Sequence, residues 1–217
     1  MPLKPVPRTL LRDSAYAAIR DAVVRGDLAP GAAVRDQDLA EQLGLSRAPV
    51  RDALARLADE GLVERKPQSH TRVTPVVLRD VQDAASVVRA MHELAARTGV
   101  PALTDAQVAR MRAANRRFAA ACAADDLDTA LVADDELHDV LVVASGNRAA
   151  AATIARYTPL IRRLERRQFS PAGARRSVEL HEELIDACTA RDAEEATLVT
   201  ARIWQSLVEL ATDPSLS

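Results

Sequence analysis

The 217-residue sequence predicts a mainly α-helical protein in which three short helices and a hairpin precede an all-helical bundle. Hydrophobic residues make up 48% of the chain but aromatic residues only 2%, so the apolar content is mostly Ala, Val and Leu, which favours packed helices over a sheet sandwich or barrel. Seven Gly and 28% charged residues exclude collagen-like and fully disordered chains. After Pro75 the strand signals end and long Ala-rich helical patterns follow.

Three helices and a hairpin are expected in the first part of the chain. Tyr16, Ile19 and Val23 recur at helical spacing and indicate the first helix. The side chain of Ser46 is expected to cap the following helix, and Pro49 falls in the first turn of that helix, where no backbone donor is needed. The expected elements are a Pro-punctuated tail at 1–10, helices at 12–25, 36–43 and 46–58, and a two-stranded hairpin around 66–70.

Six longer helices are expected in the remainder. Thr104 and Gln107 have the spacing of a capping box, and so do Asp192 and Glu195. Pro159 is expected to kink or split the helix that contains it. The helices are expected at 79–98, 105–123, 127–145, 148–168, 172–190 and 193–211, and the two domains at 11–75 and 76–217.

Composition also limits the compartment and the partners. Cys122 and Cys188 lack the spacing of metal or redox motifs, which indicates free thiols in a reducing cytosol. No apolar run approaches the ~18 residues that a membrane span needs, so we expect a cytoplasmic protein with no membrane partner. Two Phe, two Tyr and one Trp offer no stacking platform for RNA or single-stranded DNA.

The helix at 46–58 has the pattern of a DNA recognition helix. Val50, Leu54 and Leu57 form one apolar stripe that must pack on the preceding helices. Arg47 and Arg51 lie four residues apart near the helix N-terminus, the part of a recognition helix that meets base edges in a major groove. Spacing alone leaves open that both arginines are ordinary solvated charges.

The segment that contains this helix resembles a known DNA-binding domain. Residues 39–54 (LAEQLGLSRAPVRDAL), with GDLAPG at 26–31 before them and LADEGLV at 57–63 after them, are similar to the winged helix-turn-helix of GntR-family bacterial transcription regulators. The resemblance implies an N-terminal winged helix-turn-helix domain that binds double-stranded DNA at a pseudo-palindromic operator. It implies that the DNA-contacting residues are Arg35, Ser46, Arg47, Pro49, Arg51 and His70.

Two departures from the family pattern concern the DNA contacts. Gln37 stands where the family often has a second Arg, and residues 67–70 at the wing tip lack the usual glycines. Minor-groove contact by the wing is therefore in question, although His70 could still reach a phosphate.

In the second part, polar side chains interrupt apolar helix faces. Asp134 and His138 lie four residues apart on one predicted helix, and His181 lies on an apolar face of another. A buried carboxylate or imidazole must find a partner, and three such groups converging inside a bundle make a divalent-metal site physically reasonable. The alternative is an Asp134–His138 pair with His181 bonded separately.

This part resembles the helical, FCD-like ligand-sensing domain of the FadR-type branch of the same family. The resemblance rests on residues 88–96, on Asp134 and His138, on the stop at 145–147, and on His181. It implies a divalent metal such as zinc, nickel or manganese held by Asp134, His138 and His181. The fourth family ligand falls on Ile203, so the site either has three protein ligands completed by water and effector or is a metal-free pocket.

Three further groups of polar residues have two interpretations each. The resemblance implies that Arg89 holds an effector carboxylate; the alternative is a salt bridge to Glu93, four residues later. His92 is either a core histidine or the replacement for the missing imidazole. The arginines at 162–167 are expected to form a solvated face.

These observations together predict a transcription regulator and not an enzyme. We expect a homodimeric repressor whose helical domain binds a small carboxylate effector and thereby shifts the spacing of its two DNA-reading domains. The alternatives are a helical-bundle metalloenzyme or metal-binding protein and a purely architectural DNA binder. Against an enzyme, no Ser, Cys or Lys nucleophile has a recognisable base at motif spacing.

Overall fold

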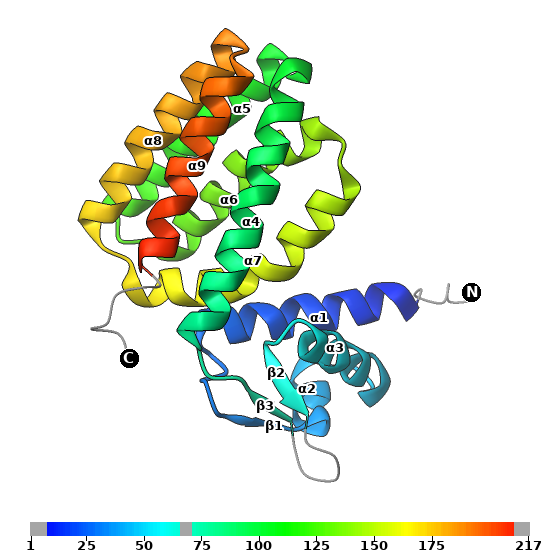
Figure 1. The fold of residues 1–217 in the computed structure, drawn as a ribbon. Helices are drawn as coiled ribbons and strands as arrows, with labels where there is room; N and C mark the ends of the chain where they lie inside the picture. The colour runs from blue at the N-terminus through cyan, green and yellow to red at the C-terminus, as the bar shows by residue number, and fades with distance from the viewer. Residues whose placement is uncertain (1–7, 66–70, 211–217) are drawn as a thin grey trace. The chain divides into compact units, whose positions relative to one another are not determined.

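A computed structural model describes residues 8–65 and 71–210, and its chain divides into two compact units after Val77 (Figure 1). The mainly helical fold class predicted from the sequence is confirmed. In the first unit the elements are α1 (Arg8–Arg25), β1 (Ala33–Val34), α2 (Asp36–Leu43), α3 (Arg47–Asp59), β2 (Val63–Arg65) and β3 (Thr71–Val73).

The core of the first unit lies between α1 and α3. Ile19 and Val23 of α1 are buried, as are Val50, Leu54 and Leu57 of α3, so the apolar stripes predicted for both helices form this core. Burying each such side chain contributes about 1.5–3 kcal/mol. Close packing against α1 fixes which face of α3 remains at the surface.

The turn between α2 and α3 depends on a glycine. Gly44 caps α2 in the left-handed conformation, with φ of 63°, and its N–H bonds to the carbonyls of Ala40 and Glu41. Ser46 has the extended backbone of an N-cap, but its side chain makes no capping hydrogen bond, so the prediction that its hydroxyl caps α3 is wrong.

A three-stranded sheet completes the first unit. The predicted hairpin strands are present as β2 and β3, and β1 pairs antiparallel with β3 to give the order β1-β3-β2. Strand β1 was not predicted, because two residues are too few for an alternating pattern. Helix α1 begins at Arg8, so residues 8–10 belong to it and not to the predicted tail.

Over its described residues, 78–210, the second unit is a bundle of six long helices and one short 3₁₀ turn. Its helix bounds match the predicted ones within one residue. Thr104 and Gln107 form the predicted capping box, and Asp192 accepts a hydrogen bond from the N–H of Glu195. The elements are α4 (Leu78–Gly99), η1 (Val100–Ala102), α5 (Asp105–Ala123), α6 (Leu127–Ser145), α7 (Arg148–Gln168), α8 (Pro171–Ala190) and α9 (Ala193–Leu210).

Helix α4 packs against three neighbours in the bundle, α6, α7 and α9, while α5 packs against α6 and α8. At its C-terminal end α4 approaches α6 so closely that a Cβ on Gly99 would lie 2.7 Å from the carbonyl oxygen of Leu141. Helix α7 continues through Pro159, so the proline does not split it, and Figure 1 shows that its axis bends along its length. None of the helices in the described ranges is long and apolar enough to cross a membrane.

Candidate functional site

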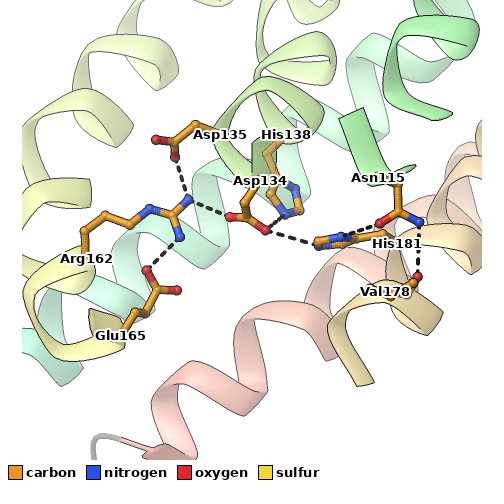
Figure 2. A network of polar contacts seen from close by, with 8 residues as sticks. All are labelled: Asn115, Asp134, Asp135, His138, Arg162, Glu165, Val178 and His181. Atoms are coloured by element: carbon orange, nitrogen blue, oxygen red, sulfur yellow. Dashed lines mark hydrogen bonds and ion pairs between the residues drawn. The ribbon is translucent and has the colours of Figure 1, made fainter. Parts of the chain in front are cut away.

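Helices α6 and α8 bring Asp134, His138 and His181 together inside the second unit (Figure 2). The ligand atoms that the three residues offer all lie within 4.8 Å of one another. His138 Nε2 lies 3.8 Å and His181 Nε2 lies 3.4 Å from the same oxygen of Asp134, Oδ1. Both imidazoles are buried, with exposed fractions of 5% and 1%. The structure thus joins the three groups, rather than isolating His181 from an Asp134–His138 pair.

Arg162 of α7 completes this cluster, and the sequence analysis missed it. Its NH2 group lies 2.5 Å from an oxygen of Asp134 and 2.5 Å from one of Asp135, and its NH1 group lies 2.7 Å from Glu165. Arg162 and Arg163 are buried, so the predicted solvated arginine face is wrong. The prediction failed because the packed bundle encloses this part of α7 and the guanidinium is paired with three carboxylates there.

Burial and pairing set the charge of the cluster. Burial raises the pKa of Asp134, but the Arg162 guanidinium and the two imidazoles outweigh it and hold that pKa well below its ordinary value. Burial lowers the pKa of His138 and lowers that of His181 to about 4, although Asp134 opposes both shifts. Near neutral pH the carboxylate is therefore charged and the imidazoles are neutral, which are the states that ligate metals.

Asn115 of α5 fixes the orientation of His181. The amide nitrogen of Asn115 donates to the carbonyl of Val178 and to Glu182, at 3.2 and 2.6 Å, so its oxygen is left to accept from His181 Nδ1 at 3.1 Å. Nδ1 then carries the proton, and the lone pair of Nε2 faces Asp134 (Figure 2). A lone pair and a carboxylate that face each other favour a cation between them.

A cavity of about 460 Å³ opens beside the cluster. Ile203, the residue at the predicted fourth ligand position, lies on its wall and offers no ligand atom. The polar lining includes Asp134, His138, His181, Arg162, Glu165, Gln168, Ser170, Arg176 and Ser177, and the apolar lining includes Phe118, Leu131, Phe169, Leu180, Ile203 and Trp204. This mixture of apolar walls and convergent polar groups is typical of a small-molecule site.

Arg89 and His92, the predicted effector-binding residues, do not line this cavity. Arg89 bonds to Glu93 at 2.7 Å and to Gln205 at 2.5 Å, so the alternative salt bridge is present. His92 is buried and stacks on Trp204 with ring centroids 4.5 Å apart, which are the surroundings of a core histidine. Effector contact by either residue stays a prediction.

Trp204 is a second residue that the sequence analysis missed. Its indole is buried on the cavity wall, and its Nε1 has no hydrogen-bond partner among the described residues. A buried donor without a partner is unfavourable, so the contribution of Trp204 to the site is the apolar wall that its ring forms. Nothing in the sequence distinguishes this tryptophan from a core residue.

The predicted DNA-contact residues of the first unit lie around the turn from α2 to α3. Arg35 is exposed at the N-cap of α2. Arg47 and Arg51 are exposed on α3, next to Ser46 and the half-buried Pro49. His70 lies outside the described residues.

Comparisons with known proteins agree with this arrangement. Residues 11–73 match the family model of bacterial regulatory proteins, gntR family, and residues 78–206 match that of the FCD domain. An uncharacterized HTH-type transcriptional regulator from an unstable DNA locus of Streptomyces ambofaciens is 34% identical over 190 residues, which cover 85% of this chain and 78% of the relative.

Two further proteins show the same similarity at lower identity. The HTH-type transcriptional repressor RspR of Escherichia coli K12 is 24% identical over 148 residues, which cover 68% of this chain and 65% of the relative. The solved structure of E. coli McbR/YncC matches with a TM-score of 0.82 at 22% identity, over 93% of this chain and 96% of that chain, and so has the same fold.

Proposed function

The chain belongs to the gntR family of bacterial regulatory proteins and carries an FCD domain, and we propose that it is a repressor whose operator binding is controlled by a small organic acid. Transcription regulation through DNA follows from the family, and the matched relatives are regulators and not enzymes. That RspR is named a repressor supports the direction of control. The proposal of an effector rests on the convergence of Asp134, His138 and His181 at the wall of a cavity.

On the DNA side, α3 is the recognition helix. Arg47 and Arg51 lie four residues apart on its exposed N-terminal half, where guanidinium groups can reach guanine O6 and N7 in the major groove. Ser46, Pro49 and Arg35 lie at the starts of α3 and α2, near the path of the DNA backbone, and Arg35 supplies a phosphate contact.

The donor set of the second unit fits a divalent metal. One charged carboxylate and two neutral imidazoles converge, Asn115 turns the lone pair of His181 toward Asp134, and Ile203 leaves the remaining positions to water or ligand. Zinc, nickel and manganese all accept such ligands. When bound, the ion supplies a Lewis-acidic charge that attracts a carboxylate.

The effector is a carboxylic acid small enough for a cavity of about 460 Å³. Arg162 neutralises part of the negative charge of Asp134, Asp135 and Glu165, which lowers the repulsion that an incoming anion meets. The aromatic and aliphatic walls, among them Phe118, Leu131 and Trp204, exclude water around the body of the acid.

Control of the operator follows by linkage in a cytoplasmic homodimer. A pseudo-palindromic operator presents two half-sites, so two recognition helices must be held at a matching spacing. If the acid binds better to the dimer geometry that misfits the operator, acid and operator weaken each other by the same factor, commonly 5–150-fold in allosteric proteins.

Operator release tests this function. The full chain, loaded with zinc, would first select its operator from random DNA duplexes, and operator affinity would then be measured against a panel of mono- and dicarboxylic acids. At least one acid should weaken binding at least fivefold by the linkage above. The effect should persist in Glu136→Gln, exposed on the same helix, and disappear in His138→Ala. An affinity that no acid changes would contradict the proposal.

A further inference from the structure

An ion pair joins the first residues of α2 and α3 in the first unit. Arg47 Nε donates to Asp36 Oδ2 at 3.2 Å, and Arg47 Nη2 donates to the two carboxylate oxygens at 3.0 and 3.1 Å. The contact spans the turn at Gly44, since Asp36 opens α2 and Arg47 opens α3. The side chain of Arg47 is 61% exposed and that of Asp36 only 26%, so the carboxylate is the more enclosed partner.

This pairing occupies one edge of the guanidinium. The contacts use Nε and Nη2. The other edge of the guanidinium, formed by Nη1 and Nη2, therefore keeps N–H donors that the carboxylate does not bind. Arg recognises guanine through two parallel N–H groups that reach O6 and N7. Asp36 therefore contacts the side of the Arg47 guanidinium and leaves the two N–H groups at its end available for base recognition.

Beyond the small stabilisation that a carboxylate gives to the N-terminus of a helix, the ion pair of Asp36 adds little to stability. A half-exposed ion pair contributes little to folding, and a negative charge next to a DNA-binding helix repels phosphates. What the contact does supply is orientation, because a free arginine side chain has many rotamers and must lose them when it docks on a base. Asp36 is itself held in place, because the buried Leu39 and Ala40 anchor α2 in the core.

We propose that Asp36 is a positioning residue for DNA recognition: it holds the Arg47 guanidinium in the geometry that reads a guanine and so sets the base preference at that operator position. This inference rests on the proposed role of Arg47 in reading the operator. It extends the DNA-recognition set to a residue that does not itself contact a base.

The test is a selection of DNA sequences by five forms of the full chain: wild type, Asp36→Asn, Asp36→Glu, Arg47→Ala and Asp38→Asn. The last variant removes one negative charge from an exposed position of the same helix and is the matched control. Each form is used to select from a pool of random-sequence DNA duplexes. Its affinity is then measured for the wild-type motif and for an unrelated duplex.

Arg47→Ala should lose base preference at one position of each half-site, and Asp36→Asn should relax the same position. We expect Asp36→Asn to bind the wild-type motif about tenfold more weakly, within the range for one bidentate base contact, and to bind the unrelated duplex no more weakly than wild type does. Asp36→Glu should restore part of the preference, and Asp38→Asn should select the wild-type motif.

Three results would overturn the inference in distinguishable ways. If Arg47→Ala relaxes a position that Asp36→Asn leaves unchanged, Arg47 reads DNA without help from Asp36. If Arg47→Ala selects the wild-type motif, Arg47 reads no base, and the proposed role of Arg47 in reading the operator fails as well. A loss of affinity in Asp36→Asn that is equal for motif and unrelated duplex would indicate damage to the domain and not to base reading.

Discussion

An Asp–Arg pair lies at the centre of each unit's candidate site, but the two pairs differ in their surroundings. Asp36 and Arg47 meet at 3.0 Å with side chains 26% and 61% exposed. Asp134 and Arg162 meet at 2.5 Å with side chains 15% and 9% exposed, and Arg162 also pairs with Asp135 and Glu165. The same two functional groups thus act in water in one unit and largely out of water in the other.

This difference in exposure predicts which of the two pairs contributes more to the free energy of unfolding. An exposed pair is weakened by solvent screening and contributes about 0–1 kcal/mol, so the pair of the first unit serves orientation. Removing one partner of a buried pair leaves a charge that neither water nor protein compensates, so the pair of the second unit is structural as well as functional.

Replacement of Arg162 should have the largest effect. Arg162→Ala removes the guanidinium from Asp134, Asp135 and Glu165 and should lower the free energy of unfolding by about 3–5 kcal/mol. Arg47→Ala, the matched change in the first unit, should lower it by less than about 1 kcal/mol. Urea denaturation of both variants measures the difference, and equal shifts of the two midpoints would contradict the contrast.

Acid should destabilise the second unit through His181. Burial lowers the pKa of His181 in the folded chain to about 4, against an ordinary value of 6.5, so between these pH values the unfolded chain binds the proton and the folded chain does not. Stability therefore falls as the pH drops from 6.5 to 4.5, by about 2 kcal/mol for this group.

The pH effect is measured by urea denaturation in the presence of a metal chelator. His181→Gln removes the titrating group and should have a flatter profile over the same range. A wild-type profile no steeper than that of the variant would show that His181 is protonated in the folded chain.

Removal of the Asn115 amide should weaken metal binding without removing a ligand. Asn115→Ala frees His181 to rotate and to change tautomer, and we expect zinc affinity to fall about 10–100-fold, as for other residues that orient a ligand. Titration with zinc in the presence of a competing chelator measures the change. Phe118→Leu, beside the same imidazole but without a hydrogen bond to it, is the control and should retain most of the affinity.

Among the buried contacts, the smallest effect is expected at one in the first unit. The hydroxyl of Tyr16 donates to Glu60 at 2.7 Å, while Arg56 also pairs with Glu60 and lies over the Tyr16 ring. Tyr16→Phe keeps the ring and leaves Glu60 with Arg56, so the loss should be only about 1 kcal/mol. Thermal unfolding measures it, with Tyr157→Phe in the second unit as the control. A loss as large as that of Arg162→Ala would refute the ranking.

Local sequence signals were sufficient for most of the fold. The apolar stripes of α1 and α3, the stop at Gly44 and the capping box at Thr104 each depend on residues a few positions apart, which the sequence displays directly. Strand β1 was missed because its partner, β3, lies some forty residues later in the chain. The hydroxyl of Ser46 was misassigned because composition cannot show which way a side chain turns.

Only part of the candidate site could be predicted, because the rest depends on contacts between residues far apart in the sequence. Asp134, His138 and His181 interrupt apolar faces, and such interruptions are readable in a sequence. Arg162 was read as solvated because it lies among other arginines, and only packing of α7 in the bundle reveals its burial. Asn115 gives no sequence signal at all, since its role depends on a bond to a residue 66 positions away.

The most direct test of the account is the metal content of the full chain, purified without a histidine tag and compared with two single variants. We expect about one equivalent of zinc, nickel or manganese in the wild type, because three residues can supply ligands. His138→Ala should lose the metal, and Cys188→Ala, on the same helix as His181 but outside the donor set, should keep it. A wild-type protein that holds no metal even after incubation with zinc would contradict the account, and Asp134, His138 and His181 would then be the polar lining of a metal-free pocket.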